Sequence, residues 1–314
     1  MASKTTDASA TTDETAPWYA DVLASIVGAG RRLTTVLTHS SMYLVCIAVA
    51  EVATVHAALS TGPTPAPVVV GLVAYAVYAG DRIADAERDE RTCPERSAFV
   101  ARHRTLLSIT SAGAYGVAIA LSVTGGPLAV GITLVPGAFW VLYASAWFPT
   151  LSTRCKRLKR VFVVNSTLVA TAWALAVVGL PIAFANAAVT PLVVVVFTYF
   201  LVDTFVNTEI PNVRDVEADA EDGVHTLPVV LGVRRTRHVL YGIDVLLVAL
   251  VGTATLTGLL SVSVGVAILV GLGYALMLAW FVGRTTALGR LSVACEAKHL
   301  LVFGVLWGLT AIGV

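Results

Sequence analysis

Long apolar runs dominate this sequence and leave few folds open to it. Runs of roughly 20 residues, each long enough to cross a bilayer core, recur along most of the chain. We count nine, at about 34–59, 66–80, 105–123, 128–147, 161–182, 190–208, 238–257, 262–283 and 296–314. Inside hydrocarbon the backbone must satisfy its own hydrogen bonds, which favours helices. We therefore predict an all-α membrane protein, with nine transmembrane helices bundled around a central cavity.

The basic residues support this helix count. If the nine runs all cross the membrane, the connections on the same side as the N-terminus contain all 21 Lys and Arg residues. The opposite connections, such as 60–67 and 124–127, contain none. Because positive residues concentrate on the cytoplasmic side, we predict a multi-pass protein of the cell membrane with its N-terminus in the cytoplasm. The net charge of +1 gives no reason to expect a nucleic-acid partner.

The sequence before the first apolar run divides into two parts. Residues 1–17 are rich in Thr, Ala and Asp and lack a periodic apolar face, so we expect a disordered tail. Residues 18–32 are amphipathic and fit a helix lying at the membrane interface, although an extension of the first transmembrane helix fits equally well. We assign 33–314 to a single transmembrane domain.

Acidic residues cluster at two places, each directly after an apolar run. Residues 209–223 contain six carboxylates in a chain that is only 13% charged, namely Glu209, Asp215, Glu217, Asp219, Glu221 and Asp222. An earlier cluster after the second run contains Asp81, Asp85 and Asp89. The predicted topology places both clusters at the cytoplasmic mouth of the bundle.

The spacing within each cluster indicates a helix with acids on one face. Asp81, Asp85 and Asp89 recur every four residues, and Asn212, Asp215 and Asp219 follow at i, i+3 and i+7. Like charges at i,i+4 destabilise a helix, so such stacking indicates that a cation is bound. The alternative is a solvated loop whose acids are neutralised by neighbouring arginines (Arg82, Arg88, Arg91).

These residue types fit magnesium and a diphosphate. Mg²⁺ binds through one or two carboxylates and completes its shell with water and phosphate oxygens. Five cations lie between residues 154 and 160, and we expect Lys156, Lys159 and Arg160 to contact the diphosphate. A positive-inside anchor explains their sign equally well. Asn165 follows as a further polar ligand for the substrate.

Some polar and aromatic residues lie within the apolar runs. Glu51 lies in the first and Asp203 in the sixth, and ionisable residues inside a membrane are functional candidates by default. We interpret Asp203 and Glu209 as candidates for orienting or deprotonating an acceptor, and Asp244 as a partner of a nearby arginine. The aromatic group after the fourth run fits an interfacial belt or the lining of an allylic chain site (Trp140, Tyr143, Trp147, Phe148).

The two acidic motifs resemble those of the UbiA superfamily of intramembrane prenyltransferases. That family has nine transmembrane helices and Asp-rich motifs after the second and sixth. Its first motif, Asn-x-x-x-Asp-x-x-x-Asp, matches Asp81, Asp85 and Asp89, and its second matches Asn212, Asp215 and Asp219. The continuation through Leu-Pro-Val-Val-Leu-Gly at 227–232 is also very similar. The resemblance covers about residues 33–314.

The resemblance implies Mg²⁺-dependent transfer of a polyprenyl group from an allylic prenyl diphosphate to a hydrophobic acceptor. It places Mg²⁺ on the five aspartates of the motifs, with Asn212 as a neutral ligand. The commonest family role implies an aromatic quinone precursor as acceptor, and a glycerol-ether lipid, haem or a carotenoid are the alternatives. No protein partner is evident from the sequence.

The sequence also departs from the family pattern. Asp81 replaces the usual Asn, Pro211-Asn212 replaces a Lys-Asp pair, and Val164 stands where a Lys commonly precedes Asn165. These changes keep open a second class of function, a membrane protein that binds a prenyl lipid without catalysis. A transporter ranks third, because nearly all acids lie at the predicted mouth instead of midway along helices.

Overall fold

The computed structural model describes residues 18–313, apart from 88–89, 91–92, 145–163 and 222. The described part of the chain is helical throughout and contains no strand. The predicted tail 1–17, Asp89, Lys156, Lys159 and Arg160 lie outside the described residues. The long helices, in chain order, are α1 (Trp18–His39), α2 (Met42–Leu59), α3 (Ala66–Ala84), α5 (Pro94–Ser122), α6 (Gly126–Ala144), α8 (Val164–Ala174), α10 (Pro191–Arg214), α13 (Val233–Leu256), α14 (Val262–Ala279) and α16 (Lys298–Ala311). Shorter elements are α9 (Leu180–Ala185), α11 (Val216–Glu221), α12 (Leu227–Leu231) and α15 (Leu288–Glu296).

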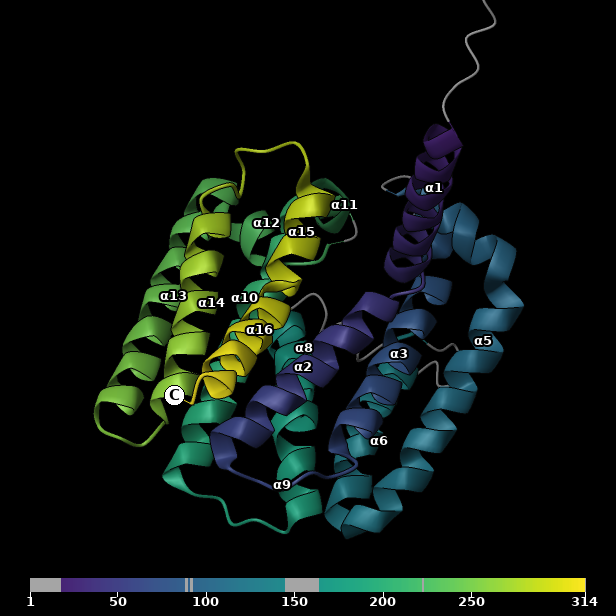
Figure 1. The fold of residues 1–314 in the computed structure, drawn as a ribbon. Helices are drawn as coiled ribbons and strands as arrows, with labels where there is room; N and C mark the ends of the chain where they lie inside the picture. Colours follow the sequence, from purple (N-terminus) through teal and green to yellow (C-terminus); the bar gives the residue numbers. More distant parts are fainter. Residues whose placement is uncertain (1–17, 88–89, 91–92, 145–163, 222, 314) are drawn as a thin grey trace, which may run out of the picture.

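From α2 onward the long helices form a bundle in which successive helices run in opposite directions, whereas α1 runs in the same direction as α2 (Figure 1). Helices α3 and α10 end at the upper end of the bundle in this view, where α5 and α13 begin. The short helices α11, α12 and α15 lie at the same end, and α1 projects beyond it. We refer to this as the motif end, because it contains Asp85 and Asp215 at the ends of α3 and α10. The C-terminus lies at the opposite end (Figure 1).

Eight segments of the described chain are long and apolar enough to cross a membrane, where the sequence predicted nine. The difference lies in one segment, Pro94–Phe139, which contains most of both α5 and α6. A 3-10 turn at Val123–Gly125 and the positive φ of Gly126 (80°) separate those two helices. The multi-pass all-α architecture is thus confirmed, and the count of nine stays a prediction.

The predicted start of the first transmembrane helix, at about residue 34, is wrong, because this helix begins at Met42. The helix is interrupted at Ser41, whose φ of 62° is left-handed, so that α1 and α2 are separate helices. Residues 18–32 therefore belong to a helix that is not continuous with the membrane helix. Their location at the membrane interface stays a prediction.

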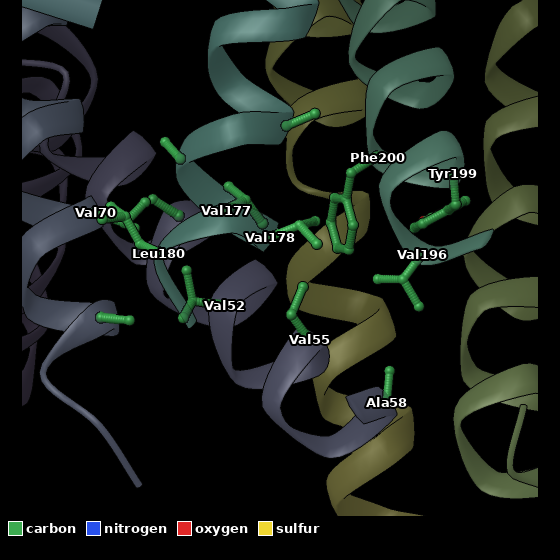
Figure 2. Packing of buried hydrophobic residues seen from close by; sticks show 14 of the residues in the cluster. Val52, Val55, Ala58, Val70, Val177, Val178, Leu180, Val196, Tyr199 and Phe200 are labelled. Atoms are coloured by element: carbon green, nitrogen blue, oxygen red, sulfur yellow. The ribbon is translucent and has the colours of Figure 1, made fainter. Parts of the chain in front are cut away.

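Small and β-branched residues build the centre of the bundle. Figure 2 shows α2, α3, α10 and the π-helical segment η2 (Leu175–Gly179) meeting around side chains such as Val52, Val178 and Phe200. Gly71 lets α3 approach α2 closely, since a Cβ there would lie 3.2 Å from Val45. Lipid tails are as apolar as these side chains, so close packing rather than escape from water holds the helices together.

Candidate active site

The two helices that carry the acidic motifs end in the same way. Helix α3 ends just before Asp85, which has φ −95° and ψ 7°. Helix α10 ends just before Asp215, which has nearly the same angles, φ −96° and ψ 11°. Each of these aspartates donates its backbone N–H to the carbonyl four residues earlier, at 2.9 Å for Asp81 and 3.3 Å for Pro211. The central acid of each motif is therefore the C-cap of a membrane helix.

The prediction that each triplet lies on one face of a continuous helix is wrong. Both helices stop at the central acid, and Asp219 belongs to the separate helix α11. The C-terminal end of a helix disfavours carboxylates and favours cations. The last turn of each helix accordingly contains an arginine, Arg82 in α3 and Arg214 in α10.

Glu296 at the end of α15 connects the two motifs. The hydroxyl of Tyr43 on α2 donates a hydrogen bond of 2.5 Å to Glu296 Oε2. The charges of Arg82, Arg214 and Arg96 all act on this carboxyl group. Arg82 lies within the first motif and Arg214 borders the second, so charges from both motif-bearing helix ends act on Glu296.

Helix α1 also reaches the motif end. The ring of His39, its last residue, meets Phe99 edge-on at 5.7 Å between ring centroids. Burial lowers the pKa of His39 below its ordinary value, and Arg96 and Arg82 add to that shift while Glu95 opposes it. The ring contact places the end of α1 beside the start of α5, within range of the charges around the end of α3.

Arg214 holds the carboxylate of Asp215. Its Nε donates to Oδ1 at 2.8 Å and its Nη2 to Oδ2 at 2.6 Å, so both oxygens are engaged. Such two-fold pairing of a guanidinium with a carboxylate is a strong form of ion pair. A metal ion that binds Asp215 would compete with this arginine for the carboxylate charge.

The carboxylates at the motif end suit Mg²⁺ chemically but are not gathered into a finished site. Asp81 and Asp85 are exposed, Asp215 is half-buried and Asp219 is buried. Within the described ranges, no three His, Cys, Asp or Glu side chains lie together closely enough to hold a metal. Mg²⁺ needs only one or two carboxylates when substrate phosphates complete its shell. The donor set thus fits a metal that binds together with its substrate.

Glu209 is a fully buried junction between three helices. Ser166 of α8 donates to its Oε1 at 2.5 Å, while the Asn212 side chain and the backbone N–H of Leu227 donate to Oε2 at 3.1 and 3.2 Å. Leu227 is the first residue of α12, so the carboxylate also satisfies a free helix N-terminus. These contacts favour a positioning role for Glu209. Asn165, half-buried, adjoins the partner Ser166 in the chain.

Asp203 lies deep in the bundle and is fully buried. Lys298 Nζ lies 2.5 Å from its Oδ1 and also donates to Asn207 Oδ1 at 3.0 Å. The imidazole of His299 lies between two acids, with Nε2 at 3.0 Å from both Asp203 Oδ2 and Glu51 Oε1. We name the core ion network as the five ionisable residues that meet here, Glu51, Asp203, Asp244, Lys298 and His299.

Two members of this network were interpreted wrongly from the sequence. Lys298 was counted among the cations of a cytoplasmic connection, yet it is 1% exposed and follows a turn at Ala297 inside the candidate span Leu288–Ala311. Asp244 was expected to pair with one of the arginines at 234–237. It is fully buried, and neither oxygen has a hydrogen-bond partner among the described residues.

Sequence reasoning missed His299 and the role of Lys298. The available signal was the Lys-His pair beside a long apolar run, opposite in sign to the isolated acids Glu51 and Asp203. Buried cations in membrane helices pair with acids on other helices. The aromatic group predicted at 140–148 lies outside the described side chains.

Comparisons with solved structures show where this fold occurs. A UbiA homologue from Aeropyrum pernix K1 in its apo form matches with a TM-score of 0.59 and 14% identity, over 88% of this chain and 99% of that one. Digeranylgeranylglyceryl phosphate synthase matches with a TM-score of 0.56 and 15% identity, over 88% and 97%. A UbiA homologue from Archaeoglobus fulgidus bound to GPP and Mg²⁺ matches with 0.56 and 14%, over 86% and 99%. At this level of identity the likeness is one of fold.

The sequence itself carries a family signature. No curated protein sequence matches the chain. The family model described as the UbiA prenyltransferase family matches residues 41–302, which include both acidic motifs, Glu209 and the core ion network. The chain belongs to the UbiA prenyltransferase family.

Proposed function

We propose that this protein transfers a polyprenyl group from an allylic prenyl diphosphate to a hydrophobic acceptor, with Mg²⁺ as cofactor. The observation that carries the proposal is the matched pair of helix ends, Asp85 on α3 and Asp215 on α10, at one end of an apolar membrane bundle. The homologue from Archaeoglobus fulgidus bound to GPP and Mg²⁺ has the same fold and supports this choice of donor and metal.

The motif end is the proposed diphosphate site. The candidate Mg²⁺ ligands are Asp81, Asp85, Asp89, Asp215 and Asp219, with Asn212 as a neutral ligand. Mg²⁺ would there stabilise the negative charge that develops on the departing diphosphate. Lys156, Lys159, Arg160 and Asn165 are the proposed diphosphate contacts on the protein. We place this end in the cytoplasm and the protein in the cell membrane, as the distribution of basic residues predicts.

The interior of the bundle is the proposed site of the apolar chain. Val, Ala, Leu and Phe side chains surround the centre and would exclude water, which otherwise captures an allylic cation. Asp203 is a candidate for deprotonating the acceptor because it lies deep in this interior. Glu209 would act indirectly, since its oxygens hold Asn212 and the start of α12.

An aromatic quinone precursor is the proposed acceptor, and a glycerol-ether lipid, haem or a carotenoid remain the alternatives. The second candidate function is binding of a prenyl lipid without catalysis. Two observations favour it: Arg214 occupies both oxygens of Asp215, and Asn212 replaces an acid at the start of the second motif.

Diphosphate release distinguishes the two functions. The purified protein in lipid nanodiscs is incubated with Mg²⁺, labelled geranylgeranyl diphosphate and membrane lipid extract as the source of acceptor. We expect Mg²⁺-dependent release of diphosphate and one labelled lipid product. Asp85→Ala and Asp215→Ala should lower the rate by about 10²-fold or more, whereas Glu217→Ala, an exposed acid on α11, serves as the matched control. Binding of the donor without release under any condition would favour the non-catalytic function.

A further inference from the structure

Three acids and two basic residues meet in the core of the bundle, away from the motif end. We propose that three of them, Glu51, His299 and Asp203, form the group that accepts the proton lost by the acceptor during prenyl transfer. This inference rests on the proposed function and adds to it a set of residues that the motifs do not contain.

The geometry around His299 indicates a shared proton. Its Nε2 lies 3.0 Å from a carboxylate oxygen of Glu51 and 3.0 Å from one of Asp203, yet it meets the angular requirement of a hydrogen bond with neither. An imidazole nitrogen carries at most one hydrogen, so it cannot satisfy two ionised carboxylates. All three side chains are at most 3% exposed. Two acids in such a position share a proton between them and the ring.

The charges of the network lead to the same conclusion. Lys298 pairs with Asp203, and its charge also acts on Asp244, which leaves His299 as the basic group beside Glu51. Asp244 has no hydrogen-bond partner for either oxygen in the described chain. Even with a protonated His299, the acids outnumber the cations by one. A buried carboxylate without a partner binds a proton instead of staying charged, so the network holds at least one exchangeable proton.

The network lies near the middle of the membrane. Asp203 is about 18 Å along α10 from Pro191, and the hydrocarbon core is about 30 Å thick. Figure 2 shows Phe200, which precedes Asp203 on α10 by about one turn, beside Val178 of η2 and Val55 of α2. The Phe200 ring stacks on His299 with centroids 5.9 Å apart. Ionisable residues at this depth mark proton pathways and polar sites.

The chemistry of the reaction requires a base. When the allylic C–O bond breaks, the diphosphate leaves with both electrons, and an electron pair of the acceptor forms the new bond to the allylic carbon. The acceptor then loses one proton, from the ring carbon of an aromatic acceptor or from the hydroxyl oxygen of a glycerol lipid. Water is a poor candidate base, because the site must exclude it to protect the cation. The remaining candidates are the diphosphate and a buried acid–histidine group.

Neighbouring groups set the proton affinity of this group from every side. Trp173 of α8 donates to the second oxygen of Glu51 at 2.7 Å, and Asn207 of α10 lies 3.4 Å from Asp203 Oδ2. The charge of Lys298 acts on Asp203, and Asp244 interacts electrostatically with both of them. Tyr199 on α10, Tyr78 on α3 and Cys295 on α15 are further titratable neighbours. Glu209 is unsuited to the role, because three donors already occupy its oxygens.

Two variants test the proposal. Glu51→Gln is isosteric, and His299→Gln is close in volume but loses the ring that stacks on Phe200; each removes a proton-accepting group. We expect product formation to fall by about 10²-fold or more and its dependence on pH to disappear. Mg²⁺-dependent binding of the donor at the motif end should remain within about twofold of wild type. Thr54→Val is the matched control, because Thr54 is a buried residue of α2 whose hydroxyl bonds only the carbonyl of Ala50.

Each outcome decides between the candidates. Wild-type rates and an unchanged pH profile in both variants would identify the diphosphate as the base and overturn the proposal. Equal losses of donor binding, thermal stability and product would show a structural role and also overturn it. If a variant does not fold, the infrared spectrum of the wild-type protein decides: a protonated-carboxyl band that titrates is expected, and its absence contradicts the proposal. Wild-type protein that binds no donor and releases no diphosphate would instead refute the proposed function.

Discussion

Lys298 on α16 and Asp203 on α10 form an ion pair in the interior of the bundle, with Nζ and Oδ1 2.5 Å apart and both side chains at most 1% exposed. The two residues are 95 positions apart in the sequence, yet together they tie the start of α16 to α10. A cation at this depth is costly unless it is paired, so the pair fixes which helices meet.

Breaking this ion pair should lower the stability of the bundle. We expect Lys298→Met to lower the free energy of unfolding by about 3–5 kcal/mol, because it leaves the Asp203 carboxylate buried without its cation. The double variant Lys298→Met/Asp203→Leu should recover most of that loss. Reversible unfolding in mixed detergent micelles measures both. A double variant as unstable as the single one would show that helix packing, and not the ion pair, depends on Lys298.

Arg214 should compete with metal for Asp215. Since a partly exposed ion pair is worth about 0.2–1 kcal/mol, we expect Arg214→Gln to tighten Mn²⁺ binding by up to about fivefold in the absence of donor. Both side chains of the pair are about a quarter exposed, at 23% and 25%. Titration calorimetry measures the affinity, and Arg235→Gln on α13 is the control. Unchanged or weaker binding would mean that Asp215 is not a metal ligand.

Glu209 should contribute mainly to the stability of the fold and not directly to the reaction. We expect Glu209→Ala to cost at least about 3 kcal/mol of stability, since it removes three hydrogen bonds and each hydrogen bond to a charged group is worth about 1.5–3 kcal/mol. Loss of the bond to the Leu227 N–H should also speed amide hydrogen exchange at the start of α12. A fully stable variant that has lost only activity would contradict this and would identify Glu209 as a group that acts on the substrate.

The parts of this protein that depend on local sequence could be predicted. Apolar length gave the membrane helices, and the spacing of acids identified the residues at the ends of α3 and α10. The stop at Asp85 and Asp215 was missed because periodicity describes a face and ignores the repulsion between carboxylates and a helix C-terminus.

The core ion network could not be predicted for a different reason. Lys298 and Asp244 were interpreted from their nearest charged neighbours in the chain. Their actual surroundings depend on which helices meet across the bundle, and a single sequence does not specify that. The turn at Ala297 directs Lys298 and His299 into the bundle, but no Gly or Pro in the sequence marks it.

Glu296 should hold the two motif ends at a fixed separation. Tyr43 donates to its carboxyl group, and the charges of Arg82 and Arg214 act on it. Glu296→Gln removes the negative charge that attracts both arginines, so it should loosen both helix ends at once. Spin labels at the exposed positions Glu87 and Glu217, in a background without native cysteines, report the separation by electron paramagnetic resonance. We expect a narrow distance distribution in the parent protein and a broader one in the variant, which Mg²⁺ and donor together narrow again. Glu221→Gln, at an exposed position on α11, is the control. An unchanged distribution in Glu296→Gln would mean that helix packing alone sets the separation, and that α15 does not couple the two motifs.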